Sequence, residues 1–186
     1  KIIKANELTK NYTEKARHLE LLKKKFETSP LVAGWLARAY FEAKQLPKSV
    51  ELLRGEIKKN KSQKSSYFAL LDILEEAKNN YEVRILLSDM LQAFPNDPLV
   101  HTRHCRYFAE GGFLEDAATS CESAIEFAPE VAENHVNLGI TKSNLNEPAA
   151  AEKILKHAAA RFPKSEPAQY TAGKLMDESK NWHASA

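Results

Sequence analysis

Four side chains that can bind metals or form a covalent bond lie close together in the sequence. His101, His104 and Cys105 stand in "HTRHC", and Cys121 follows shortly after. Residues four apart share a helix face, so His101 and Cys105 could join Cys121 of a partner helix in a zinc site, which takes about four N or S ligands. A fourth ligand is not apparent, and the same positions suit an apolar core in which cysteine acts as a small hydrophobe. We therefore expect no metal, and a Cys105–Cys121 disulfide is the better alternative if the Cα atoms come within bridging range.

Beyond these four residues, the sequence contains no pattern typical of catalysis. It has no nucleophile motif, no glycine-rich phosphate loop and no metalloprotease signature. The stretch "AEGGFLED" reads as a turn between two helical segments. The acidic pairs Glu75–Glu76 and Asp177–Glu178 are adjacent on a helix, so their carboxylates point in different directions. We expect no enzyme, no catalytic residue and no cofactor.

The elements that hold these residues follow a period of 34 residues. Pro95, Pro129 and Pro163 are spaced by this step. The same step aligns columns of mostly apolar or small residues, which include Leu36, Leu70, His104, Leu138 and Ala172, and also Leu53, Leu87, Cys121 and Leu155. A period of about 20 to 50 residues is typical of stacked supersecondary units.

Each period contains two helical segments. In "PLVHTRHCRYFAEGG" the apolar residues fall on one helix face, and Gly111 and Gly112 end the helix because glycine adopts the left-handed conformation of helix ends. The segment "FLEDAATSCESAIEFAP" forms the second helix and ends at Pro129, because proline cannot donate to a continuing ladder. Pro47 and Pro148 suit the first turn of a second helix, where a missing N–H costs little.

Short side chains predict where the two helices of a period approach each other. We expect these contacts at three pairs of small residues: Ala37 with Ser49, Cys105 with Ala117, and Gly139 with Ala151. The longer side chains, such as Leu53 and Leu155, are expected to fill the seams to the next unit. A helix pair of this kind cannot bury its apolar face alone, so it stacks on its neighbours.

This pattern resembles the tetratricopeptide repeat family. The matching residues are the pairs Leu36–Ala37 and Leu138–Gly139, the aromatics Tyr40 and Phe108, the small residues Ala117, Ala124, Ala151 and Ala158, and the closing prolines Pro95, Pro129 and Pro163. The resemblance implies an all-α fold, a right-handed α-solenoid of antiparallel helix pairs. Its repeats would span residues 30–63, 64–97, 98–131 and 132–165, followed by a partial fifth repeat or capping helix at 166–186. In the first repeat, Glu56 and Lys61 depart from the family's pattern.

Residues 1–29 do not fit the period cleanly. Their apolar stripe has a gap at Lys15 and a heptad-like spacing, and it comprises Ala5, Leu8, Tyr12, Leu19, Leu22 and Phe26. We expect a helical lead-in, or a degenerate repeat half, that covers the apolar face of the first repeat. The alternative is a connector from an upstream domain, because the chain begins without methionine and is expected to be a piece of a larger multidomain protein.

The family resemblance places a partner-binding groove on the concave side, along the first helix of each pair. The predicted groove residues are Arg38, Phe41, Glu42, Phe68, Asp72, Glu75, Thr102, Arg106, Val136, Ile140, Asn144, Tyr170 and Lys174. Aromatic side chains dominate interface energetics, and Arg38 and Arg106 could hold a carboxylate through paired hydrogen bonds. We expect a non-catalytic scaffold or adaptor that holds a protein or peptide segment. The alternative for some of these aromatics is packing within the solenoid.

The charge distribution offers two further hypotheses. Residues 1–64 hold 16 basic and 7 acidic residues, a net +9, and the remaining residues hold 11 basic and 18 acidic, a net −7. The basic part of one molecule could therefore meet the acidic part of another in a homo-oligomer. Nucleic acid binding through Lys58, Lys59, Lys61 and Lys64 is the weaker alternative, and nucleic acid is not the expected partner because such binding relies on an overall basic surface.

The sequence also bears on the compartment. No apolar run approaches the roughly 18 residues of a membrane-spanning helix, and no signal peptide is visible. Two cysteines fit a reducing compartment slightly better than an oxidising one. We expect a cytoplasmic location, with a periplasmic or envelope-associated one as the alternative.

Overall fold

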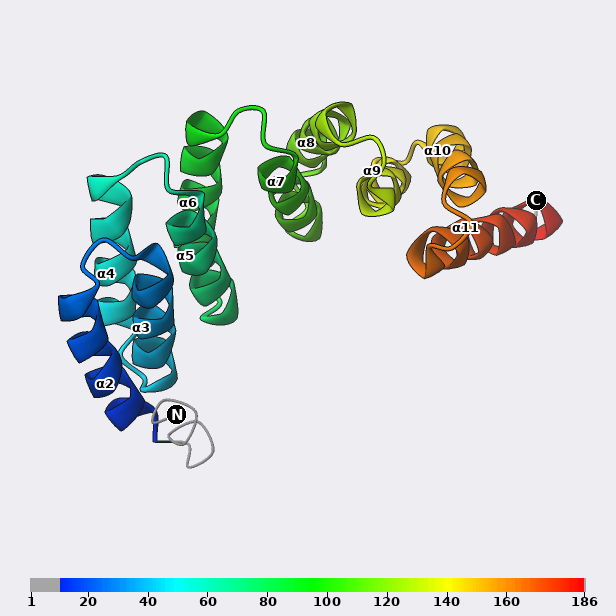
Figure 1. Ribbon diagram of the computed structural model, residues 1–186. Helices are drawn as coiled ribbons and strands as arrows, with labels where there is room; N and C mark the ends of the chain where they lie inside the picture. Colours follow the sequence, from blue (N-terminus) through cyan, green and yellow to red (C-terminus); the bar gives the residue numbers. More distant parts are fainter. Residues whose placement is uncertain (1–10, 186) are drawn as a thin grey trace. The chain divides into compact units, whose positions relative to one another are not determined.

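The described residues form α-helices throughout. The computed structural model describes the backbone of residues 11–185 and the side chains of residues 11–175 and 177. This range contains ten helices and no strand (Figure 1): α2 (Tyr12–Lys25), α3 (Pro30–Glu42), α4 (Leu46–Lys59), α5 (Lys64–Glu76), α6 (Asn80–Ala93), α7 (Pro98–Glu110), α8 (Leu114–Phe127), α9 (Ala132–Asn144), α10 (Pro148–Arg161) and α11 (Glu166–Ser185). The prediction of an all-α fold is therefore confirmed.

The chain divides into two compact units, Lys1–Ala93 and Phe94–Ala186. In the described part, the first unit contains α2 to α6 and the second contains α7 to α11. In each unit, the helices form pairs whose first and second members alternate along the chain. The first helices α3, α5, α7 and α9 have 13 residues each, and the second helices α4, α6, α8 and α10 have 14.

The turns between paired helices repeat with the same 34-residue step. The residue after each first helix's C-cap has a positive φ: 63° at Lys44, 55° at Lys78, 79° at Gly112 and 62° at Asn146. The next N–H then donates to the carbonyl five residues back, as Gln45 does to Tyr40 at 2.8 Å and Phe113 to Phe108 at 2.9 Å. This arrangement is the Schellman motif that ends helices. Gly112, rather than Gly111, therefore supplies the left-handed residue of the α7–α8 turn.

The contacts inside a helix pair include one that was predicted and one that was not. The Ser49 hydroxyl donates to the Ala37 carbonyl at 2.7 Å, which holds α4 against α3 at a pair of short residues. In α9, however, Gly139 lies against Leu155 of α10. Leu155 therefore packs within its own pair, where the missing glycine side chain leaves room for it, and its place in a seam to the next unit stays a prediction.

Helix α2 packs against the first pair. Its residues Ala16 and Leu19 form a buried cluster with Leu36 and Ala39 of α3. Within residues 12–25 a helix thus covers part of the first pair, although Phe26 is 48% exposed. The predicted stripe residues Ala5 and Leu8 lie outside the described residues. Helix α2 begins 34 residues before α4 and has the same length of 14 residues, which favours the interpretation as a degenerate repeat half.

Lys15 departs from the stripe for a physical reason. It occupies the gap in the apolar pattern, yet its side chain is only 9% exposed. The ammonium group reaches Glu42 of α3 at 3.2 Å, so the buried charge is compensated by a carboxylate.

Candidate functional site

Cys105, Cys121 and His101 each have a bonding partner within the second unit. Cys105 of α7 and Cys121 of α8 form a disulfide with their Cα atoms 5.1 Å apart, and both are buried. A zinc ion would need thiolates, and these sulfurs are bonded to each other. His101 donates through Nε2 to the Pro95 carbonyl at 2.8 Å, and the described residues contain no group of three or more metal-ligating side chains.

His104 belongs to the same buried layer. Its ring stacks on Phe108 with centroids 3.9 Å apart, and its Nδ1 lies 2.8 Å from the Ser120 hydroxyl. Burial lowers the pKa of His104 to about 4, although the nearby Asp116 carboxylate acts in the opposite direction. The imidazole is therefore neutral at physiological pH and packs as part of the core.

Each unit has its own candidate binding surface, the solvent-facing side of its first helices, which we name the first-helix face of that unit. In α3 it consists of Leu31, Trp35, Arg38 and Glu42, which share one side of the helix because they are three or four residues apart. Leu31 is 59% exposed and Trp35 is 49% exposed. An exposed tryptophan beside an exposed leucine offers a partner two large apolar contacts.

An ion-pair network crosses this face of the first unit. Arg38 Nε lies 3.2 Å from Glu42 and Arg38 Nη1 lies 2.6 Å from Glu76 of α5. Glu42 also pairs with Lys15 of α2, so the network connects three helices. Burial lowers the pKa of Arg38, but hydrogen bonds to Glu76 and Glu42 outweigh it, so the net pKa is raised. A partner carboxylate would have to compete with both glutamates for this guanidinium.

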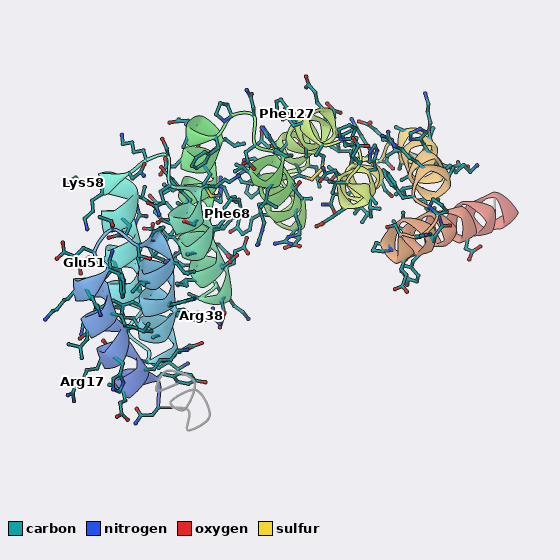
Figure 2. The ribbon with its side chains drawn as sticks, viewed as in Figure 1. Arg17, Arg38, Glu51, Lys58, Phe68 and Phe127 are labelled. Atoms are coloured by element: carbon teal, nitrogen blue, oxygen red, sulfur yellow. A yellow bond between two sulfur atoms is a disulfide. The ribbon has the colours of Figure 1, made fainter. Side chains whose placement is uncertain are left out.

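The other predicted groove residues of the first unit differ in exposure. Phe41 is half-buried, with the Arg38 guanidinium 5.4 Å from its ring centroid. Phe68 and Glu75 of α5 are half-buried, and Asp72 is exposed. Figure 2 shows Arg38 and Phe68 on one side of the first unit, and Glu51 and Lys58 of α4 on the other.

The first-helix face of the second unit contains a small pocket. It measures about 170 Å³ and lies between α7 and α9. Its lining residues are Arg106, Ala109, Glu110, Asn137, Ile140 and Asn144. The structure therefore brings together three of the predicted residues, Arg106, Ile140 and Asn144, and adds Asn137 to them.

Asn137 is the pocket residue with an unmet hydrogen bond. Its Nδ2 atom is buried and has no acceptor among the described residues. A buried amide N–H without an acceptor costs about 1–3 kcal/mol. An acceptor that entered the pocket, such as a peptide carbonyl, would remove this cost.

Two of the predicted groove residues lie instead in the contact between consecutive first helices. The Thr102 hydroxyl of α7 donates to Asn134 of α9 at 2.7 Å. Val136 is 5% exposed and packs in a cluster with Ala168 of α11. The prediction of Val136 as an accessible groove residue is therefore wrong, because this repeat position faces the next first helix. Tyr170 is 73% exposed and Lys174 of α11 is also exposed.

The sequence carried a signal for both residues that the prediction missed. Trp35 follows Leu31 by four residues and precedes Arg38 by three, so helical spacing alone places it on their face. Asn137 stands in the repeat one place after Val136 and three before Ile140. The prediction took the place that faces the neighbouring helix instead of the adjacent place, whose side chain lines the pocket.

Comparisons with known proteins bear on the fold. The chain is similar to residues 41 to the end of MamA from Desulfovibrio magneticus RS-1, at 14% identity and a TM-score of 0.67 over 89% of this chain and 93% of that one. It is similar to YrrB, described as a TPR protein with an unusual peptide-binding site, at 12% identity and a TM-score of 0.65 over 90% and 87%. It is also similar to TTC0263, a thermophilic TPR protein in Thermus thermophilus, at 15% identity and a TM-score of 0.62 over 94% and 95%.

These similarities show that the chain has the fold of tetratricopeptide repeat proteins, which confirms the predicted resemblance. No family model matches the sequence, and no curated protein matches it. In the described part of the chain, none of the helices combines the length and the apolar character that a bilayer crossing requires.

Proposed function

We propose that the chain is a non-catalytic scaffold or adaptor that holds an extended segment of a partner protein on the first-helix face. The buried Asn137 Nδ2 without an acceptor carries this proposal, because it lines a pocket on that face and can donate to a peptide carbonyl. Ile140 is 40% exposed beside it, so the same place offers an apolar contact. Trp35 and Leu31 supply the equivalent apolar contact in the first unit.

The fold supports the same proposal. Tetratricopeptide-type repeats present extended surfaces rather than deep active sites, and the YrrB neighbour is described as having a peptide-binding site. The described residues hold no group of metal ligands.

A selection experiment tests the proposal. Peptides are selected from a displayed random library on the wild-type chain, synthesised with a fluorophore, and measured by fluorescence polarisation. Asn137→Ala is expected to lower the affinity for a selected peptide by about tenfold, which corresponds to the loss of one buried hydrogen bond. Trp35→Ala is expected to weaken peptides that occupy the first unit.

The matched control is Lys164→Ala, an exposed residue between α10 and α11. It is expected to leave the affinity unchanged. If neither Asn137→Ala nor Trp35→Ala changes the affinity of any selected peptide, the binding site lies elsewhere on the chain and the proposal is rejected.

Self-association is a second candidate function, because the two units carry opposite charge. Residues 1–93 hold 18 basic and 12 acidic residues, a net +6, and residues 94–186 hold 9 basic and 13 acidic residues, a net −4. Helix α8 alone contains Glu115, Asp116, Glu122 and Glu126 and no basic residue. Light scattering across salt concentrations tests this candidate: oligomers at low salt that dissociate at high salt support it, and a monomeric mass at low salt removes it.

A further inference from the structure

A groove runs between α4 and α6 in the first unit. Two hollows of about 540 and 520 Å³ lie along it, and Arg54 lines both of them. At one end of the groove, the N-terminal residues of α4 and α6 form the walls. At the other end, the C-terminal residues of the same two helices form them. Helix α5 supplies the floor through Tyr67, Leu70 and Leu74. We name this feature the α4–α6 groove.

The α4–α6 groove is separate from the first-helix face. On α5, Leu70 and Leu74 line the groove, whereas Asp72 and Glu76 belong to the side that meets Arg38. Two residues along a helix correspond to a turn of about 200°, so these two sets point in nearly opposite directions. Figure 2 shows Lys58 of α4 on the side of the unit away from Arg38 and Phe68.

The two ends of the groove have different chemistry. At the end where α4 begins, Leu46, Pro47 and Val50 make an apolar wall. At the end where α4 finishes, Lys58 and Lys61 stand at the rim above Ile57, Leu70 and Leu86. Neither lysine makes an ion pair within the described part of the chain, and Lys58 is exposed. Asp89 and Gln92 of α6 complete this end, and burial together with the Asp89 charge raises the pKa of Tyr67.

An ion pair crosses the groove at its middle. Arg54 of α4 bonds to Glu82 of α6, and Arg54 lines both hollows. The arginine therefore lies over the floor and separates the apolar end from the basic end. A carboxylate that entered the groove could replace Glu82 as the partner of Arg54, because both carboxylates offer the same acceptor geometry.

The repeat register shows that the basic rim is specific to this place. One repeat of 34 residues after Arg54 and Lys58, the corresponding residues are Ser88 and Gln92. Two repeats after them, the corresponding residues are Glu122 and Glu126. The second unit has a corresponding hollow of about 380 Å³ over α9, lined by Ile125, Leu138 and Ile154. The apolar floor is thus shared by both grooves. Glutamates stand at the register positions of Arg54 and Lys58 in the second unit, although they do not line its hollow, whose rim includes Lys153 and His157.

From these observations, we infer that the α4–α6 groove is a second docking site, which takes an extended peptide segment with a run of acidic residues next to a run of apolar residues. The acidic run lies over Lys58, Lys61 and Arg54, and the apolar run contacts Leu46 and Val50. Charge complementarity and the apolar floor together select this occupant. A nucleic acid backbone would meet the lysines but leave the apolar wall without a partner.

A labelled peptide tests the inference. Fluorescein-tagged Glu-Asp-Glu-Asp-Pro-Leu-Pro-Leu is titrated with the wild-type chain at low salt and followed by fluorescence polarisation. A second peptide has the same composition but alternates each acidic residue with a leucine or a proline. The wild type is expected to bind the first peptide about tenfold more tightly than the second, because only the first matches both ends of the groove.

Two charge variants make the test specific. Lys58→Glu/Lys61→Glu is expected to lower the affinity for the first peptide by about tenfold or more. Lys24→Glu/Lys25→Glu is the control, since it makes the same change of net charge on the exposed side of α2 and is expected to bind as the wild type does. Val50→Glu, at the opposite end, is expected to weaken binding too. Circular dichroism melts establish that each variant is folded, and Lys58→Gln/Lys61→Gln replaces the first variant if it is not.

Each result supports or rejects the inference. If both double variants lose the same affinity for the first peptide, or if the wild type binds both peptides equally, the peptide is attracted by net charge alone. Either result rejects the α4–α6 groove as its binding site. Tighter binding of an oligothymidine than of the peptide would assign the lysines to nucleic acid instead. Trp35→Ala is expected to leave this peptide's affinity unchanged. If it weakens binding as much as the lysine variant does, the peptide occupies the first-helix face and the second site is rejected.

Discussion

Gly139 of α9 lies directly beneath Leu155 of α10. A β-carbon on Gly139 would stand 2.5 Å from Cγ and Cδ2 of that leucine. One repeat earlier, the same two positions are Cys105 and Cys121, which form the disulfide between α7 and α8. The close contact between paired helices therefore recurs at one register, and the two repeats build it with different chemistry.

The first prediction concerns this glycine. Gly139→Ala is expected to lower the free energy of unfolding by about 1–3 kcal/mol, because the new methyl group overpacks a buried site. Alanine favours a helix over glycine by about 1 kcal/mol, which only partly offsets the overpacking. Urea denaturation measures the change.

Gly55 is the matched control for that prediction. It lies in α4, and a β-carbon there would meet no atom within 4 Å. Gly55→Ala is therefore expected to stabilise the protein by about 0.5–1 kcal/mol. If the two alanine variants have the same stability, Leu155 does not pack on Gly139 as described.

The second prediction concerns the disulfide. It closes a loop with a sequence separation of 16, for which the chain-entropy model gives a stabilisation of about 3 kcal/mol. Adding a reductant is expected to lower the urea midpoint of the wild type. The Cys105→Ala/Cys121→Ala variant is expected to be insensitive to reductant. Two reactive thiols in the unreduced, denatured protein would contradict the presence of the bond.

These contacts show how far the sequence could be interpreted. The 34-residue step predicted the helix pairs, because prolines and small residues mark their ends and their contacts. The period did not indicate that Leu155 as well as Ala151 could contact Gly139, because Ala151 and Leu155 are four residues apart from each other and therefore lie on the same side of α10. It also left the disulfide as an alternative to a core of free cysteines, because the pairing depends on a Cα separation that only the structure supplies.

The third prediction concerns pH. The pKa of His104 is about 4 in the folded chain and about 6.5 in an unfolded one. Between these values the unfolded state binds more protons, so stability is fully present above pH 6.5 and falls as the pH decreases toward 4. The expected loss is on the order of 3 kcal/mol.

A leucine at this position tests the pH dependence. Leu70 and Leu138 occupy the same repeat place, so His104→Leu is compatible with the fold. Urea denaturation at several pH values is expected to show that the free energy of unfolding decreases less between pH 6.5 and 4 in this variant than in the wild type. The exposed His157 provides the control as His157→Leu. An unchanged pH profile in His104→Leu would assign the decrease to other groups.

The fourth prediction concerns a buried carboxylate. Glu56 is 6% exposed and lies 3.2 Å from Lys23 and 3.0 Å from Lys59. Burial raises its pKa, but the hydrogen bonds from Lys59 and Lys23 outweigh this and lower it. Lys23→Met is expected to destabilise the protein by about 1.5–3 kcal/mol, because it removes a hydrogen bond to a charged group.

The double variant Lys23→Met/Glu56→Met completes the cycle. Met90 stands at the position of Glu56 in the next repeat, and replacing a buried ion pair by apolar residues is often neutral or stabilising. The double variant is expected to be more stable than Lys23→Met alone. If it is equally unstable, the lysine acts through its packing rather than through the ion pair.

The candidate site was predicted less completely than the fold. Of the repeat positions taken from the family resemblance, Arg38, Arg106 and Ile140 are at least partly exposed on the first helices, and their role in binding stays a prediction. The same positions placed Val136 there, although it faces Ala168 of α11. The sequence pattern alone does not separate Ile140, which is 40% exposed, from Val136, which is 5% exposed, because both are branched apolar residues four apart on one side of α9.

The most direct test of the central claim is a map of amide chemical shifts in the ¹⁵N-labelled chain during titration with a selected peptide. We predict that the largest shifts come from the first helices, in α3 and α5 or in α7 and α9, and that they include Trp35 or Asn137. Shifts confined to the second helices α4, α6, α8 and α10 would contradict the claim that the first-helix face binds the partner.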